Sequence, residues 1–360
     1  MKKICFVVGA RPNFMKISCL IRELKKRELK DIEYKLIHTG QHYDENLSKI
    51  FFEDLKIEKP GINLSIGSGS HCYHVYETIK RMEREFNKDR PHIVIASGDV
   101  NSVLGTSIVT AKMMIKFAHV EAGIRLYDRT IPEETNRLVA DVLADYNFCL
   151  LEEHTEILFN EGIPRERIFH VGDLMIDSII FNLDLIKDLK IKEKDFALMT
   201  IHRAVNTDHK ENLEFILSTV NELARNYHVI FPIHPRTINF IKKYNFEKLI
   251  ENIDIRKPMG YLEFLSHMVN SRFVITDSGG IQTETTFLEI PCLTMKETTG
   301  HMNTVRDGTN VLIGYDRGLF FEEVEKILKE HVKKVKRYHL WDGKVAERII
   351  DIILEKLKNI

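Results

Sequence analysis

The sequence lacks the features that several classes of protein require. Only five of its 360 residues are cysteine, and they are scattered without a Cys-x-x-Cys pair. We therefore expect reduced thiols, not a disulfide framework or a zinc site. No stretch approaches the roughly 18 to 20 apolar residues of a membrane span, and the first apolar run meets Arg11 too soon for a signal peptide. These absences predict a cytoplasmic protein that does not enter a membrane.

A surplus of positive charge is also missing. The 52 Lys and Arg residues face 53 Asp and Glu residues, so the formal net charge is -1. Such a balance argues against nucleic acid as a partner, and we interpret the basic run 333–337 as solvated surface. The chain has neither a Gly-x-Gly-x-x-Gly after its first apolar run nor a P-loop Gly-Lys-Ser/Thr. We therefore expect no NAD and no cycle of ATP hydrolysis.

What the sequence does contain is a regular alternation of apolar runs and helical patterns. This alternation is typical of βα units around a parallel sheet that is buried on both faces. The chain is also too long for one hydrophobic core, and 44% of its residues are apolar. We predict an α/β protein with two sheets. The expected strands are 4–8, 34–37, 93–96, 117–120 and 146–150 in the first sheet, and 196–200, 228–231, 273–276, 292–295 and 311–313 in the second.

The domain boundary is expected near residue 173. Between the two series of strands lie Val171, Gly172 and Asp173, then a helical stretch and the charged segment 187–194. We assign 1–172 to the first domain and 173–339 to the second. A last helix, 343–357, carries apolar residues at helical spacing and must pack against another part of the chain.

Polar side chains follow the strands of the first half. Ligands of open α/β sheets bind at the carboxyl ends of the strands, beside helix N-termini. Asp99 and Glu121 end two probable neighbouring strands, and Glu133 opens a nearby helix, so we expect three carboxylates on one rim. We interpret Glu134 as an acid that complements the helix dipole. The polar residues that follow these strands or open these helices are Arg11, Lys16, Gln41, His42, Asp99, Glu121, Glu133 and Arg137.

The second half repeats this arrangement with different chemistry. His202 and His234 each follow a strand, and each has an arginine within two positions. Ser278, Gly279 and Gly280 follow a third strand, where glycines let the backbone approach a phosphate at a helix N-terminus. Glu284 lies one turn into that helix, where it can meet ribose hydroxyls. A nucleotide is therefore the expected ligand of this half.

Seven motifs in order carry a resemblance to a known family. They resemble the non-hydrolysing UDP-N-acetylglucosamine 2-epimerase family over essentially the whole chain. The motifs are Gly9-Ala10-Arg11-Pro12, Thr39-Gly40-Gln41-His42, Gly98-Asp99-Val100-Asn101-Ser102, His119-Val120-Glu121-Ala122-Gly123, Pro132-Glu133-Glu134-Thr135-Asn136-Arg137, Thr200-Ile201-His202-Arg203 and Asp277-Ser278-Gly279-Gly280-Ile281-Gln282.

The resemblance implies a fold and a reaction. The fold is GT-B, two Rossmann-like domains whose parallel sheets face each other across a deep cleft, with a terminal helix (340–360) joined to the first domain. The family is usually homodimeric. Its members eliminate UDP across C1–C2 of the sugar to give a glycal, then add UDP back after C2 is protonated from the opposite face. We therefore expect a UDP-sugar as substrate, a place in polysaccharide biosynthesis, and no cofactor or metal.

The resemblance also implies roles for residues. Asp99, Glu121 and Glu133 would form the acid/base set, with Glu121 and Glu133 at C2. Positive charge for the sugar and diphosphate would come from Arg11, Lys16, Arg137 and His202, and of these four we group only His202 with the catalytic residues. The expected substrate-binding residues are Arg11, Lys16, Gln41, His42, Arg137, His234, Phe264 at the uracil, Ser278, Gly279 and Gly280 at the phosphates, Glu284 at the ribose, Lys296 and His301.

The sequence departs from the family pattern in one loop above all. Lys296 and His301 stand where the family usually has arginines, so phosphate binding there should be weaker or reshaped. Val205, His74 and Thr283 replace a glutamate, a glutamine and a glutamate, which argues against activation by a second substrate molecule. Four alternatives remain open: a UDP-2,3-diacetamido-glucuronic acid 2-epimerase, a hydrolysing 2-epimerase, a GT-B glycosyltransferase, and a catalytically silent sugar-nucleotide sensor.

Overall fold

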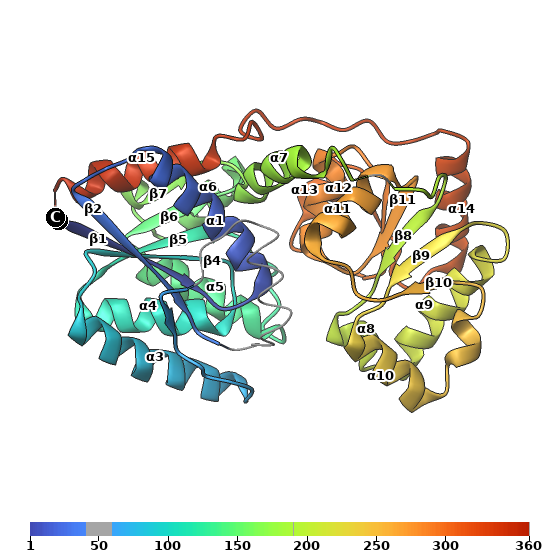
Figure 1. Cartoon of the computed structure of the whole chain (residues 1–360), viewed down its shortest axis with the longest axis horizontal. Helices are drawn as coiled ribbons and strands as arrows, with labels where there is room; N and C mark the ends of the chain where they lie inside the picture. Colours follow the sequence, from blue (N-terminus) through green and yellow to red (C-terminus); the bar gives the residue numbers. More distant parts are fainter. Residues whose placement is uncertain (41–59, 190, 360) are drawn as a thin grey trace. The chain divides into compact units, whose positions relative to one another are not determined.

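The computed structural model describes residues 1–40, 60–189 and 191–359, with Arg11 and Pro12 described by their backbone alone. These residues form two compact units (Figure 1). The first unit is Met1–Ile180 with His339–Ile360, and the second is Phe181–Tyr338. The chain passes from the first unit to the second within helix α7 (Leu174–Ile186).

The described part of the first unit contains one sheet of seven strands, all parallel, in the order β3-β2-β1-β4-β5-β6-β7. The order reverses between β1 and β4, which is the switch point where doubly wound sheets bind ligands. The central strands β1 and β4 are almost fully buried, because their apolar side chains face helices on both sides. The strands are β1 (Lys2–Val8), β2 (Ile32–His38), β3 (Ile62–Asn63), β4 (Ile93–Ser97), β5 (Lys116–Ala122), β6 (Tyr146–Cys149) and β7 (Ile168–His170).

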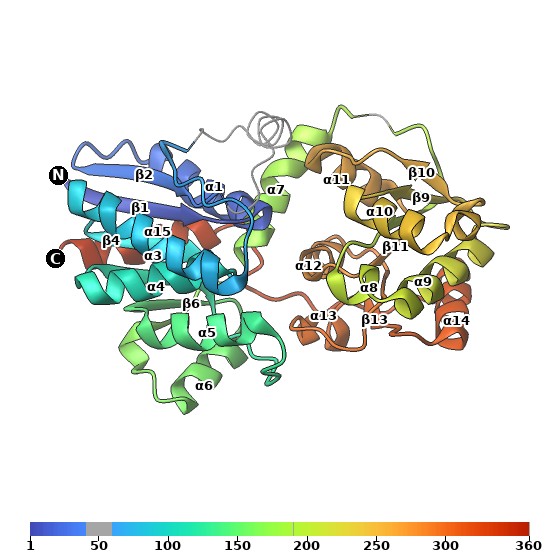
Figure 2. The ribbon, with the colours of Figure 1, turned by 90° about the horizontal axis from the view of Figure 1, so that it is seen from below.

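Helices cover both faces of this sheet. Figure 2 shows α3, α4 and α5 side by side on one face, where Met82, Val103 and Ala140 share a core with the strands. Helix α1 contacts α15 on the other face. The helices are α1 (Arg11–Lys26), α3 (His71–Lys88), α4 (Asn101–Met113), α5 (Pro132–Leu143), α6 (Glu152–Asn160), α7, and α15 (Val345–Leu357), with a 3-10 turn at Arg165–Arg167.

The second unit repeats the plan with one sheet of six parallel strands among its described residues, in the order β10-β9-β8-β11-β12-β13. Here the order reverses between β8 and β11, which form the second switch point. The strands are β8 (Ala197–Thr200), β9 (Val229–Pro232), β10 (Asp254–Arg256), β11 (Phe273–Thr276), β12 (Cys292–Thr294) and β13 (Asn310–Leu312).

Two clusters of apolar side chains form the core of the second unit. One lies under α9, α10 and α14, with Leu213, Ile241 and Phe320 against the sheet, and the other lies under α11 and α12. The helices are α8 (Ala204–Thr207), α9 (Lys210–Leu223), α10 (Pro235–Tyr244), α11 (Tyr261–Asn270), α12 (Gly279–Phe287), α13 (Met302–Arg306) and α14 (Arg317–Leu328), with a 3-10 turn at Glu247–Ile250.

A buried carboxylate holds the start of the last helix. Asp177 of α7 accepts the backbone N–H groups of Val345 (3.1 Å) and Ala346 (2.7 Å), two of the donors that a helix N-terminus leaves without an internal partner. Burial raises the pKa of Asp177 to about 6, although these two N–H groups act against the shift. In the middle of α15, Asp351 pairs at 2.5 Å with Arg27, the residue that follows α1. These contacts fix helix α15 to the rest of the first unit.

The ten predicted strand runs are confirmed, and three strands escaped prediction. β3, β7 and β10 are only two or three residues long and lie at sheet edges, where half-buried strands need no continuous apolar run. The predicted last helix begins two residues later than expected, at Val345. No helix in the described residues is long and apolar enough to cross a membrane.

Candidate functional site

A buried ion pair lies at the switch point of the first unit. Lys16 of α1 contacts the carboxylate of Glu121 on β5, and the two side chains are only 12% and 8% exposed. The Ser97 hydroxyl donates to the other oxygen of Glu121 at 3.1 Å. Burial alone would lower the pKa of Lys16, but Glu121, Asp173 and Asp99 outweigh it, and the pKa is raised. The predicted cation and one predicted acid therefore meet as a charged pair.

The backbone around Glu121 is strained. Glu121 has φ +73°, in the region that residues with a side chain rarely adopt. The register against β6 shifts between Val120 and Ala122, so Glu121 sits in a bulge. Gly98, with φ +82°, lies beside it, and a Cβ there would come within 3.2 Å of the Glu121 carboxylate. Strain of this kind is typical of functional sites, where it aims a side chain.

Asp99 forms a second charged pair next to the first. Two guanidinium nitrogens of Arg137 donate to the same Asp99 oxygen at 3.0 and 2.6 Å. The side-chain amide of Asn136 donates to the Asp99 carbonyl at 2.7 Å. Burial would lower the pKa of Arg137, but Asp99 and Glu134 outweigh it, so the pKa is raised and the guanidinium stays charged. The structure thus brings Asp99, Arg137, Lys16 and Glu121 close together.

The two neighbouring acids of α5 have different environments. Glu133 is half-buried in the first turn, about one turn before Arg137. Glu134 is buried, and its carboxylate accepts the N–H groups of Leu126 (3.0 Å) and Tyr127 (2.9 Å) and contacts Arg137 at 2.7 Å. Glu134 therefore anchors the loop before α5, a larger structural role than the expected complement to the helix dipole.

Asp173 is a member of this cluster that the sequence analysis missed. It is 4% exposed, accepts the N–H of Met175 at 2.8 Å, and follows the short strand β7. Burial first, and then the negative charge of Glu121, raise its pKa to about 6, while Lys16 acts against this. Its only sequence signal was an acid after a glycine at the end of a strand that was itself not predicted.

At the switch point of the second unit, Asp277 connects the two strand ends. This buried carboxylate accepts the N–H groups of His202 (3.2 Å) and Arg203 (2.9 Å) and the side-chain amide of Asn206 (3.0 Å). The His202 ring nitrogen Nδ1 lies 3.7 Å from Asp277, and its ring centroid lies 6.5 Å from that of His234. Burial lowers the pKa of His202; Asp277 acts against this shift, and Arg203 and His234 add to it. Asp277 was quoted in a motif, but no role was predicted for it.

The N-terminus of α12 carries the glycines predicted at the phosphates. Ser278 is the N-cap residue, and Gly279 begins the helix. A Cβ on Gly279 would lie 2.7 Å from Nε2 of His301, so the missing side chain makes room for the His301 ring. Nδ1 of His301 lies 3.4 Å from the Thr283 hydroxyl. One residue of the altered loop therefore lies directly over this helix N-terminus.

The remaining predicted site residues occupy several places. Glu284 of α12 is buried and accepts the Tyr261 hydroxyl at 3.3 Å. Phe264 of α11 packs against the core under that helix. Lys296 follows β12, and its N–H donates to the Thr294 carbonyl at 2.9 Å. The N-cap His234 accepts the N–H of Arg236 at 3.1 Å, Arg11 begins α1, and Gln41 and His42 lie outside the described residues.

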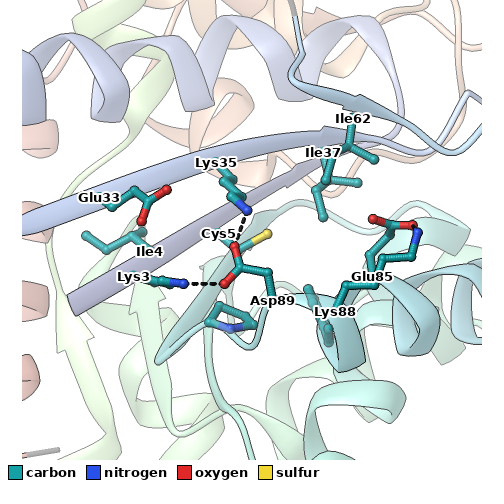
Figure 3. Close-up of a pocket in the computed structure, with 12 residues that line it drawn as sticks. Lys3, Ile4, Cys5, Glu33, Lys35, Ile37, Ile62, Glu85, Lys88 and Asp89 are labelled. Atoms are coloured by element: carbon teal, nitrogen blue, oxygen red, sulfur yellow. Dashed lines mark hydrogen bonds and ion pairs between the residues drawn. The ribbon is translucent and has the colours of Figure 1, made fainter. Parts of the chain in front are cut away.

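A separate cavity of about 200 Å³ lies beside β1, β2 and the end of α3 (Figure 3). Asp89, which pairs with both Lys3 and Lys35, belongs to its lining, and so do Cys5 and Phe86. None of the predicted site residues that the structure describes lines it. We therefore assign it no part in the chemistry of the site.

Comparison with known proteins gives one consistent result. The family model described as UDP-N-acetylglucosamine 2-epimerase matches residues 22–354. A Methanococcus maripaludis protein named UDP-N-acetylglucosamine 2-epimerase homolog is 40% identical over 98% of this chain and 99% of its own length. The crystal structure of Methanocaldococcus jannaschii UDP-GlcNAc 2-epimerase in complex with UDP-GlcNAc and UDP has a TM-score of 0.89 and 38% identity, and the match covers 98% of this chain and 99% of that one.

A second kind of enzyme is also similar. The UDP-2,3-diacetamido-2,3-dideoxy-D-glucuronate 2-epimerase of Pseudomonas aeruginosa is 36% identical over 92% of this chain and 94% of its own length. The predicted fold class, two parallel-sheet α/β domains of the GT-B type, is confirmed by the sheet topology and by the structural likenesses.

Proposed function

Because the chain belongs to the UDP-N-acetylglucosamine 2-epimerase family, we propose that it interconverts UDP-N-acetylglucosamine and its manno epimer by eliminating UDP and adding it back. The product of elimination is a glycal, with a double bond between C1 and C2. The reaction needs a group that removes the C2 proton, one that returns a proton to the opposite face, and positive charge at the departing diphosphate.

One observation carries this proposal: the buried pair of Lys16 and Glu121 beside the pair of Arg137 and Asp99. The C2 proton of a 2-acetamido sugar is not next to a carbonyl, so its direct removal would be very slow. Elimination avoids this, because the electrons left at C2 form the double bond as the C1–O bond breaks. A carboxylate held in a strained, water-poor position suits this proton transfer.

We assign the proton transfers at C2 to Glu121 and Glu133, with Asp99 as the third member of the acid/base set. Glu121 is favoured because its carboxylate is buried against a cation and aimed by a bulge. Lys16 and Arg137 supply positive charge close to these acids. Arg11, at the first turn of α1, adds a further cation in the same proposal.

The second unit would bind the nucleotide. The N-terminus of α12, which Ser278, Gly279 and Gly280 form, offers the backbone N–H groups of its first turn to the diphosphate. His202, His234, Lys296 and His301 would add side-chain contacts to the substrate. Glu284 would bind the ribose and Phe264 would line the uracil pocket, with Gln41 and His42 completing the set of substrate contacts.

A second substrate remains a candidate on a specific observation. The Pseudomonas aeruginosa relative named for a diacetamido glucuronate shares 36% identity, and the loop with Lys296 and His301 departs from the usual family pattern. A panel of UDP-hexosamines with different C3 and C6 groups, compared by kcat/KM for exchange at C2, separates the two. The homodimer and the cytoplasmic location stay predictions.

The test of the proposed function is exchange of the C2 hydrogen. The enzyme is incubated with UDP-N-acetylglucosamine in deuterated water, and the products are followed by proton NMR. We expect the manno epimer to appear with deuterium at C2. Free UDP that accumulates in step with turnover would show a hydrolase instead, and products without deuterium at C2 would rule out proton exchange.

A further inference from the structure

His119 is a fully buried histidine of β5, two residues before Glu121, to which the proposed reaction gives no role. Its Nδ1 lies 2.6 Å from Asp141 of α5, and its Nε2 lies 2.8 Å from the carbonyl oxygen of Gly98. Both side chains of the pair are at most 1% exposed. The ring is thus held at both nitrogens, with one partner on α5 and the other in the loop that carries Asp99.

These contacts determine the charge of the ring. A carbonyl oxygen can only accept, so Nε2 must carry a proton. The second Asp141 oxygen already accepts the N–H of Gly123 (3.1 Å) and of Arg125 (2.7 Å), which favours the ionised carboxylate. Nδ1 must then donate as well, and a ring that donates twice is an imidazolium. Burial would lower the pKa of His119, but Asp141, the Gly98 carbonyl and Glu121 outweigh it, and the pKa is raised.

A chain of alternating charges compensates this buried cation. Arg125 donates to Asp141 and to both oxygens of Glu161 at 2.9 and 2.6 Å, so the order is Glu161, Arg125, Asp141, His119. Burial would raise the pKa of Asp141, but His119 and Arg125 outweigh it, and the pKa is lowered. Two positive and two negative groups balance, which is the condition under which burial of charge is tolerated.

The other end of the contact is the Gly98 peptide. The N–H of Gly98 donates to the Val120 carbonyl at 3.0 Å, while its carbonyl accepts from His119, so its neighbours on β5 fix both polar groups. Ser97 on one side donates to Glu121, and Asp99 on the other side pairs with Arg137. Any change in the backbone angles of Gly98 would therefore move contacts of two proposed acid/base residues, Glu121 and Asp99, at once.

We propose that His119 is a positioning residue for the epimerase reaction, an imidazolium that holds the Gly98 carbonyl and so fixes Asp99 and Ser97 relative to Glu121. This inference rests on the proposed function for its kinetic consequence. Its structural part does not depend on any substrate. That part is the positive charge of His119 and its hydrogen bond to the Gly98 carbonyl, which we call the clamp.

The charge is tested on the wild-type protein without ligand. Histidine labelled with nitrogen-15 gives ring signals that distinguish an imidazolium from either neutral tautomer, and the His119 signals are those that a His119→Gln variant loses. We expect both nitrogens to stay protonated at pH values above the usual transition of histidine near pH 6.5. A neutral ring in this range would overturn the proposal, whatever the enzyme's activity.

The clamp is tested with two amide substitutions. His119→Gln can place an N–H donor near the position of Nε2 and so keep the bond to Gly98, while His119→Asn places one near Nδ1 and keeps only the bond to Asp141. We expect His119→Asn to lower kcat for C2 exchange by about 10²-fold with KM unchanged, the size of effect known for small misplacements of catalytic groups. His119→Gln should retain clearly more activity than His119→Asn.

A control and two outcomes decide the matter. His92 of the first unit accepts the N–H of Lys3 at 3.0 Å at the amino end of the sheet, and His92→Asn should leave kcat at the wild-type value. If both His119 variants keep the wild-type kcat and lose only thermal stability, His119 is a packing residue and the clamp is refuted. A wild-type enzyme without any C2 exchange would refute the proposed function, and the nitrogen-15 signals would still test His119.

Discussion

Replacement of Glu121 by glutamine removes the charge that faces Lys16 and keeps the shape of the side chain. Because the two side chains are 8% and 12% exposed, Lys16 would remain buried without its main partner. Loss of one member of a buried ion pair costs about 3–5 kcal/mol. The glutamine carbonyl can still accept from Lys16, and Asp173 and Asp99 also attract it. We therefore expect a loss at the lower end of that range, so that the free energy of unfolding falls by about 3 kcal/mol.

The same substitution should stop the chemistry. An amide cannot take up the C2 proton, and loss of a general acid or base lowers the rate by about 10²–10⁴-fold. The residues proposed at the uracil, the ribose and the N-terminus of α12 belong to the second unit, and the substitution leaves the charges of Lys16 and Arg137 in place, so the affinity for UDP should stay close to that of the wild type. Stability and rate should thus fall while binding does not.

Three assays separate these effects. Urea unfolding gives the stability, deuterium incorporation at C2 gives the rate, and calorimetry with UDP gives the affinity. A Lys16→Met variant and the double variant complete a double-mutant cycle, in which the double variant should be more stable than the sum of the single losses predicts. Retained exchange in Glu121→Gln would show that Glu121 is not the base. Parallel loss of exchange and UDP binding would mean that its role is structural.

Two further substitutions test single contacts. The pKa of Asp177 in the folded protein is about 6, against an ordinary 3.8, so the free energy of unfolding falls as pH rises between these values, by up to about 3 kcal/mol from this residue. When unfolding in urea is measured across this pH range, Asp177→Asn should reduce the slope of stability against pH. An unchanged slope would contradict the assignment. Gly279→Ala places a Cβ 2.7 Å from His301, so we expect UDP affinity to fall by about tenfold. Gly61→Ala, where a Cβ meets nothing within 4 Å, is the matched control, and equal UDP affinities in calorimetry would rule out the predicted clash.

The central strands could be predicted because burial on both faces demands continuous apolar runs, as in 93–96 of β4. The same reasoning places Asp99 after the end of β4 and Lys16 on the helix that follows β1, since the carboxyl ends of parallel strands share one edge of the sheet. β7 and β10 were missed because short, half-buried edge strands carry no such run. Asp173 was missed with β7, since its position depends on that strand.

The partners of the site residues could not be read from the sequence. The pairing of Lys16 with Glu121 depends on a bulge and a positive φ at Glu121, and neither follows from the order of residue types. Gly279 was expected to make room for a ligand, and its nearest neighbour is the ring of His301. In both cases the decisive quantity is the path of a loop, which tertiary packing sets.

The most direct measurement of the central claim follows the bond between C1 and UDP. A substrate with oxygen-18 in the bridge between C1 and the β-phosphate is incubated with the enzyme, and the recovered substrate is examined by phosphorus-31 NMR. If UDP departs and returns, the freed phosphate rotates, and the label moves from the bridge to a non-bridging position, while Glu121→Gln leaves it in place. Deuterium incorporation at C2 with the label still in the bridge would contradict the proposed elimination.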